Sequence, residues 1–161
     1  MVSDKSSTTE HTAGAVARGV RRLFARNGIW CLAEMPLRND RRADLMGIDP
    51  NGHIVIVEIK VTRQDLLSDN KWTDYLEFCD HFYWALAPNL DYSLLESPSY
   101  MPDQCGIIAA DEYDGAFIRS APWIRLAPAR RSKETERLGR AGLRRMTCWE
   151  DPQCSQIEGV Q

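Results

Sequence analysis

The spacing of apolar residues along the chain predicts how the fold begins. Between residues 11 and 27 apolar side chains recur every three or four positions, which predicts an amphipathic helix that ends at Asn27-Gly28. Three segments with the composition of β-strands follow, at residues 29–37, 43–49 and 53–62. The last is nearly continuous in Ile and Val, as expected of a strand covered on both faces, and the turn sequence Asp49-Pro50-Asn51-Gly52 joins it to the strand before.

The remaining pattern predicts further helices and strands. Residues 63–81 have apolar residues at helical spacing, so we expect a second helix packed on the sheet. The other expected elements are strands at 82–87 and 106–110, a long loop at 88–104, an edge strand at 116–124, and a helix at 133–146 capped by Ser132. The order α-β-β-β-α-β describes an α/β (α+β) fold, a mixed β-sheet flanked by helices. We expect one domain over residues 11–147, with residues 1–10 a disordered N-terminal tail and residues 148–161 a loose C-terminal tail.

Length and composition fit one globular domain. The chain has 161 residues and is 43% hydrophobic and 27% charged, and no apolar run approaches the roughly twenty residues that a membrane helix needs. The polar start lacks the layout of a secretory signal, so we expect a cytoplasmic protein. The five cysteines form no C-x-x-C pair, and the three histidines share no metal-binding spacing, so neither type indicates a metal site.

The small net charge of −3 hides an uneven distribution. Residues 62–116 carry 2 basic and 11 acidic residues, whereas residues 117–147 carry 9 basic and 2 acidic ones. This split indicates either an electrostatic face for nucleic acid or two solvated surfaces of opposite sign. The expected DNA contacts are basic residues on the first and last helices and in the polar segment between them: Arg18, Arg22, Arg26, Arg41, Arg42, Lys133, Arg137, Arg140 and Arg144.

One group of residues carries candidate chemistry. Glu58 and Lys60 are two apart on a predicted strand and therefore point to the same face, and the hairpin brings Asp44 beside Glu58. Two adjacent carboxylates repel each other, and a divalent cation removes that repulsion. Asp44, Glu58 and the carbonyl of Ile59 offer oxygen ligands for Mg²⁺ or Mn²⁺, and Lys60 can orient an attacking hydroxide. The simpler alternative is an ordinary salt bridge at a strand end, with Asp44 in a turn.

The sequence resembles a known superfamily at these positions. Asp44 followed, after thirteen residues, by Glu58-Ile59-Lys60 resembles the active-site signature of PD-(D/E)XK nucleases, with Ala43 in place of the proline. The segments RRADLMGID, IVIVEIKVTRQDLLSDNKW and DYLEFCDHFYWALAP resemble the MmcB family of bacterial DNA repair proteins. The resemblance covers residues 12–125. It implies a restriction-endonuclease-like fold, with Asp44 and Glu58 as metal ligands and Lys60 as the catalytic lysine.

The resemblance also suggests supporting residues. Glu10 and Glu34 are candidates for an additional carboxylate near the metal. Lys71 and Tyr75 resemble a Lys variant of the Q-x-x-x-Y element of RecB-type nucleases, although a surface pair with Tyr75 in the core explains them equally well. The tryptophans Trp30, Trp72 and Trp84 are expected in the core. Trp123 and Trp149 flank the basic segment, where edge packing or stacking on a base is open to them.

Two functions are consistent with these observations. The first is a metal-dependent endo- or exodeoxyribonuclease in DNA repair, associated with the nucleoid, that recognises DNA structure or a lesion rather than a base sequence. The second is a non-catalytic DNA-binding adaptor that keeps the nuclease fold and docks onto other repair proteins. The intact acidic and lysine residues favour the enzyme, whereas the acidic segment 62–116 favours a protein partner. A small-molecule phosphoesterase is a third class, which requires a closed pocket.

Overall fold

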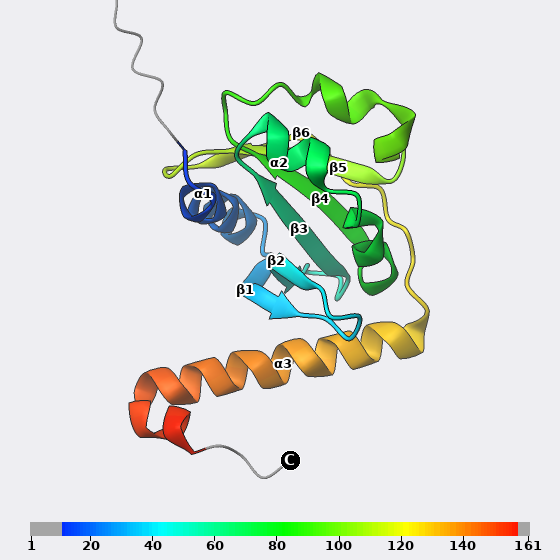
Figure 1. Ribbon diagram of the computed structural model, residues 1–161. Coiled ribbons are helices and arrows are strands. Elements are labelled where there is room, and N and C mark those ends of the chain that lie inside the picture. The colour runs from blue at the N-terminus through cyan, green and yellow to red at the C-terminus, as the bar shows by residue number, and fades with distance from the viewer. Residues whose placement is uncertain (1–10, 158–161) are drawn as a thin grey trace, which may run out of the picture.

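The computed structural model describes residues 11–157 and is built around one six-stranded sheet (Figure 1). The strands lie side by side in chain order. They are β1 (Trp30–Pro36), β2 (Arg42–Ile48), β3 (Ile54–Lys60), β4 (His81–Leu86), β5 (Cys105–Ala110) and β6 (Gly115–Arg119). The helices are α1 (Ala13–Arg26), α2 (Arg63–Ser68) and α3 (Pro128–Glu150), with 3₁₀ helices η1 (Trp72–Phe78), η2 (Tyr92–Glu96), η3 (Pro98–Tyr100) and η4 (Pro152–Gln156).

The sheet is mixed, as the sequence predicts. β1, β2 and β3 pair antiparallel, β3, β4 and β5 pair parallel, and β6 returns antiparallel to β5. The parallel pairs need crossovers, which α2 and η1 supply between β3 and β4, and η2 and η3 between β4 and β5. The α-β-β-β-α-β order is therefore present and is consistent with a restriction-endonuclease-like core.

Both faces of the sheet are covered. Apolar residues of α1, including Val20 and Phe24, pack on one face with Val55 and Val57 of β3. On the other face Ile54 and Ile56 of β3 pack in a cluster with residues of α2, η1 and α3. Alternate residues of β3 thus enter two cores, which explains its almost unbroken apolar sequence. In Figure 1, α3 runs below the sheet and α1 lies on the side of the sheet opposite α2.

The prediction of one continuous helix over residues 63–81 is wrong, because the structure has two shorter helices there. α2 ends at Ser68, where Ser68-Asp69-Asn70 forms a break, because these side chains compete with the helical backbone for hydrogen bonds. The chain then continues as the 3₁₀ helix η1. Its buried residues Trp72, Tyr75 and Phe78 are three apart, so they share one face at three residues per turn.

The C-terminal elements also differ from their predicted bounds. β6 ends at Arg119, and residues 120–127 form no strand, although Ile124 N–H donates to the carbonyl of Asp80 at 2.8 Å. α3 starts at Pro128, a favourable first-turn residue, so Ser132 lies inside the helix and caps nothing. The helix continues to Glu150, and η4 follows within the segment that we expected to be loose.

The buried carboxylate of Asp80, just before β4, fastens α3 to the sheet. It accepts hydrogen bonds from the backbone N–H groups of Ile54 and Leu126, from Trp123 Nε1 at 3.1 Å, and from the Arg131 guanidinium. Burial alone would raise the pKa of Asp80, but these donors outweigh burial and lower it. We call Asp80, Trp123, Leu126 and Arg131 the Asp80 anchor.

Candidate active site

Asp44 and Glu58 meet at the open end of the β2–β3 hairpin. The last regular pair of the ladder is Leu45 with Val57. Beyond this pair, side-chain carboxylates accept the backbone N–H groups in place of backbone carbonyls. Asp44 N–H donates to Glu58 Oε1 at 3.3 Å, and Ile59 N–H donates to Asp44 Oδ2 at 2.7 Å. The two acids thus lie side by side, as the hairpin predicts.

Both acids are held in an environment that opposes their charge. The Glu58 residue is only 5% exposed, and burial together with the neighbouring Asp44 carboxylate raises the pKa of Glu58 to about 8. Burial also raises the pKa of Asp44, although the hydrogen bond from Ile59 opposes that rise. A cation placed between the carboxylates would favour their ionised forms. Hard carboxylate oxygens are the donors that Mg²⁺ and Mn²⁺ prefer, so the residues present fit such an ion.

Lys60 projects to the face that carries α2 and η1. Its Nζ atom lies 2.7 Å from Asp69 Oδ2, and the two side chains are only 12% and 15% exposed. Nζ also lies 5.9 Å from the ring centroid of Trp84. Asp69 was missed at the level of sequence, because a continuous helix over 63–81 gives it no special place. The Ser-Asp-Asn break was the signal that could have located it. We call Asp44, Glu58, Lys60 and Asp69 the carboxylate site.

A small cleft opens beside Asp44. It has a volume of about 230 Å³, and its lining includes Asp44, Glu34, Ile59 and Arg21. Glu34 is exposed and has a left-handed backbone with φ of 51°, an uncommon conformation for a residue with a side chain. Its carboxylate lies 3.6 Å from Arg42, at the rim of the site. Glu10, the other candidate carboxylate, lies outside the described residues.

Of the predicted Lys71–Tyr75 pair, Tyr75 borders the carboxylate site with its side chain, whereas Lys71 contacts the site through its backbone N–H, which donates to Asp69 Oδ1 at 3.1 Å. Tyr75 is buried in η1, and its hydroxyl donates to the carbonyl of Arg42 at 3.2 Å. Burial raises the pKa of Tyr75, and Glu58 and Asp44 raise it further. Lys71 is exposed at the N-cap of η1.

A known protein family matches nearly the whole chain. The model of the family described as DNA repair protein MmcB-like matches residues 2–153. The chain belongs to the MmcB-like family. The solved structure of SPO1766, a protein of unknown function from Silicibacter pomeroyi, is similar at 35% sequence identity and a TM-score of 0.79, over 92% of this chain and 95% of that one. No curated protein matches the chain.

In this MmcB-like protein, ion pairs neutralise much of the charge that is unevenly distributed along the sequence. Six of the eleven acidic residues of segment 62–116 form salt bridges to basic residues: Asp69, Asp74, Glu77, Asp80, Glu96 and Asp114. Three of their partners belong to the basic segment: Arg119, Arg130 and Arg131. Segments of opposite sign in the sequence therefore partly neutralise each other in the fold.

The basic residues predicted to contact DNA fall into two groups. Several are already engaged. Arg22 donates to the carbonyl of Tyr113, Arg26 pairs with Asp114, and Arg41 pairs with Asp74. Arg42, Lys133 and Arg137 also have acidic partners. Arg18, Arg140 and Arg144 are exposed and form no hydrogen bond or ion pair to another residue of the described range 11–157.

One tryptophan that the sequence places in the core lies at the surface. Trp30, which we expected in the core, is 70% exposed and borders a cleft of about 310 Å³ together with Arg18, Arg21 and Arg22. It starts β1, an edge strand of the sheet, and its side chain is exposed to solvent there. Among residues 11–157, no helix has the length and apolar character needed to cross a bilayer.

Proposed function

We propose that this MmcB-like protein is a metal-dependent DNA nuclease that acts in DNA repair. One observation carries the proposal: the fold places the buried carboxylate of Glu58 beside the half-buried carboxylate of Asp44, next to a lysine that is held in place. Burying such a cluster costs stability unless a function or a bound cation offsets the cost. The family description supports the repair setting.

Each residue of the carboxylate site has a role in phosphodiester hydrolysis. Asp44 and Glu58, with the carbonyl of Ile59, would hold Mg²⁺ or Mn²⁺. The bound ion would lower the pKa of a water ligand and neutralise charge on the phosphate. Asp69 fixes the direction of the Lys60 ammonium, so that Lys60 can orient the attacking hydroxide or stabilise the charge on the phosphate oxygens.

The substrate that fits is DNA recognised by its shape or by a lesion. The exposed arginines Arg18, Arg140 and Arg144 offer phosphate contacts, which carry no base-sequence information. The acidic residues of segment 62–116 that form no ion pair offer a charged surface to which another repair protein could bind.

The test is cleavage of labelled single-stranded, duplex, gapped and forked DNA with Mg²⁺ or Mn²⁺. The parent is compared with Asp44→Asn and Glu58→Gln, which remove charge with little change of shape. Asp65→Asn is the matched control, since Asp65 is an exposed acid in α2, close along the chain. We expect both site variants to lose at least about 100-fold in cleavage rate, and the control to retain it.

Two outcomes would contradict the enzyme. The first is the absence of cleavage on every substrate with DNA binding intact in parent and variants, which identifies the non-catalytic adaptor. The second is cleavage that persists equally in both site variants, which places the activity elsewhere or in a contaminant.

A further inference from the structure

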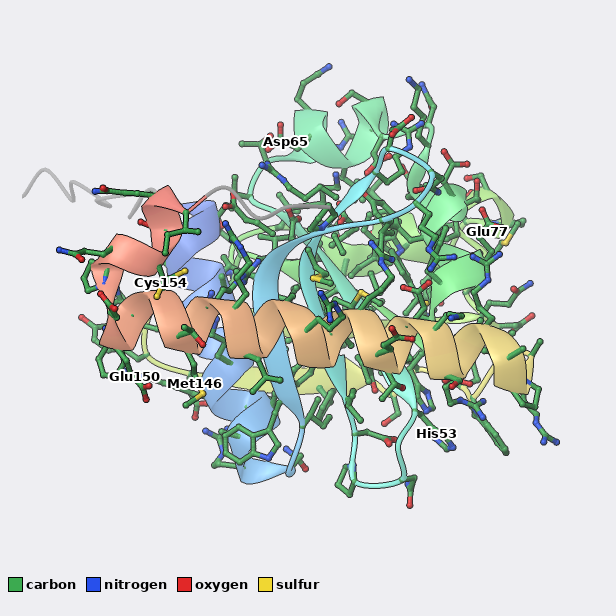
Figure 2. All side chains as sticks on the ribbon, turned by 90° about the horizontal axis from the view of Figure 1, so that it is seen from below. His53, Asp65, Glu77, Met146, Glu150 and Cys154 are labelled. Atoms are coloured by element: carbon green, nitrogen blue, oxygen red, sulfur yellow. The ribbon has the colours of Figure 1, made fainter. Side chains whose placement is uncertain are left out.

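A second cluster of ligand-type side chains lies at the other end of the β2–β3 hairpin. Asp49 follows β2, His53 precedes β3, and His81 begins β4. One ligand atom from each lies within 4.8 Å of the others. The histidine spacing in the sequence indicates no metal site, but the parallel pairing of β3 with β4 brings these residues together. Figure 2 shows His53 and Asp65 on opposite sides of α3. Asp44 and Asp49 are separated along β2 by about 16 Å, at a rise of about 3.3 Å per residue, so the two clusters are separate.

The turn between β2 and β3 positions the first two ligands. Asp49 Oδ1 accepts the backbone N–H groups of Asn51 at 2.8 Å and of His53 at 2.9 Å. Gly52 has φ of 80°, a conformation that favours glycine and closes the turn. With Oδ1 occupied, Oδ2 faces the imidazole and lies 3.3 Å from His53 Nδ1. The Asp-Pro-Asn-Gly sequence thus fixes the two side chains before any ion binds.

The third ligand is oriented by its backbone contacts. His81 Nδ1 lies 3.2 Å from the carbonyl oxygen of Ala121 and 3.1 Å from that of Pro122. Because both oxygens are acceptors, the neutral imidazole carries its proton on Nδ1, which leaves the lone pair of Nε2 for a ligand. Nε2 lies 3.4 Å from His53 Nδ1 and 3.9 Å from Asp49 Oδ2. A carbonyl bonded to the far nitrogen is the usual support of a histidine that binds metal.

The separations of these three atoms suit a small ion. In tetrahedral zinc sites, bonds of about 2.0–2.2 Å place neighbouring ligand atoms about 3.3–3.5 Å apart. The observed 3.3, 3.4 and 3.9 Å are close to this spacing. A proton on His53 Nδ1 can bridge to only one neighbour at a time, whereas a metal ion satisfies all three atoms together.

We propose that Asp49, His53 and His81 bind a divalent transition-metal ion of the Zn²⁺ type through Oδ2, Nδ1 and Nε2. A set of two imidazoles and one carboxylate selects such ions over Mg²⁺, which prefers oxygen ligands alone. The three side chains are 13% to 18% exposed, so a fourth coordination position remains open to water. This ion would be distinct from the one in the carboxylate site.

The surroundings assign the ion a structural role. His53 stacks on Trp123, with ring centroids 4.6 Å apart and an interplanar angle of 17°. Trp123 donates to Asp80, which also accepts the N–H of Ile54 next to His53. A bound ion would therefore tie together the hairpin turn, the start of β4 and the segment 121–123 that leads to α3.

The experiment is Zn²⁺ binding to the full, tag-free chain after chelator treatment, measured by calorimetry and by competition with a chromophoric chelator. His53→Phe keeps the stacking on Trp123 but removes Nδ1. His81→Asn keeps an N–H donor for the Ala121 and Pro122 carbonyls but removes Nε2. We expect one Zn²⁺ per chain in the parent and at least a 100-fold weaker affinity in each variant, since even the partners of metal ligands account for about 10- to 100-fold.

Two controls separate this site from other ligands. His11→Asn removes the remaining histidine, and the double variant Cys148→Ser, Cys154→Ser removes two partly exposed thiols near each other in sequence. Both controls should bind Zn²⁺ like the parent, and the Co²⁺ form of the parent should show an absorption spectrum without thiolate bands. Zn²⁺ binding that survives His53→Phe and His81→Asn, or that disappears in the cysteine variant, would overturn the proposal, as would absence of binding to the parent. None of these results bears on the nuclease, whose ligands are Asp44 and Glu58.

Discussion

Glu58 in β3 and Asp80 before β4 are both almost fully buried, at 5% and 1% exposure, yet the fold surrounds them differently. Asp80 receives two backbone N–H groups, an indole N–H and a guanidinium, and its pKa is lowered. Glu58 accepts a single backbone hydrogen bond at 3.3 Å and lies beside another carboxylate, and its pKa is raised to about 8.

The difference separates two uses of a buried acid. A carboxylate whose lone pairs are all satisfied by donors fastens elements together, as Asp80 fastens α3. A carboxylate left short of donors is available to a ligand, and its poor environment is tolerated where function needs it. The Asp80 anchor is therefore expected to govern stability, and the carboxylate site to govern activity.

The largest expected effect is on the anchor. Asp80→Ala leaves the Arg131 guanidinium and the N–H groups of Ile54 and Leu126 without their acceptor, and loss of one partner of a buried pair costs about 3–5 kcal/mol. Urea unfolding should show this loss, and the milder Asp80→Asn should lose less. A cost below about 1 kcal/mol for Asp80→Ala would mean that the anchor is not structural and would remove the contrast with Glu58.

The second effect is on the pH dependence of stability, to which Glu58 and Asp80 contribute with opposite signs. The folded state raises the pKa of Glu58 from 4.5 to about 8, so its contribution is complete below pH 4.5 and is lost as pH rises through 8. Asp80 has a lowered pKa, so its contribution is present above pH 3.8 and is lost as pH falls. In metal-free protein, the free energy of unfolding should therefore decline between pH 4.5 and 8.

Glu58→Gln isolates this effect. The variant should lack most of the decline and be more stable than the parent at pH 8, by an amount on the order of a few kcal/mol, since each pKa unit corresponds to about 1.4 kcal/mol. Mg²⁺ at pH 8 should stabilise the parent and not the variant. The control is Glu34→Gln, which changes an exposed acid at the rim. Parallel pH profiles for parent and Glu58→Gln would show that Glu58 is already compensated.

The sequence predicts positions that local rules fix, and it misses those that depend on contacts between distant parts of the chain. Asp44 and Glu58 lie side by side as predicted, because β-strand alternation and a short turn fix their places by local rules; the roles of these acids and of Lys60 stay predictions. Asp69 and the His53–His81 pair were not found, since their positions depend on where α2 ends and on which strands pair in parallel. The Asp80 anchor joins residues far apart in the chain, a contact that periodicity does not encode.

The fold was predicted to a similar degree. The order of elements around the first four strands was confirmed, because buried strands and the amphipathic α1 have strong periodic patterns. The extent of α2 was wrong because spacing of three suits both α and 3₁₀ helices. The prediction that Trp30 lies in the core was wrong. Its apolar side chain favours burial, but Trp30 starts the edge strand β1, where it is exposed.

The smallest expected effect extends the comparison to surface charges. Arg26 is compensated by Asp114 at 2.7 Å, whereas Arg18, two helical turns earlier on α1, has no ion-pair partner among residues 11–157. Arg18→Ala should weaken DNA binding and reduce the slope of log K against log salt by about 0.7–0.9, the value of one phosphate contact. Arg26→Ala should change the slope less, because its charge is already paired. Fluorescence anisotropy across a salt series measures both, and equal losses would show that DNA competes successfully for paired arginines, so that compensation does not predict which of them bind.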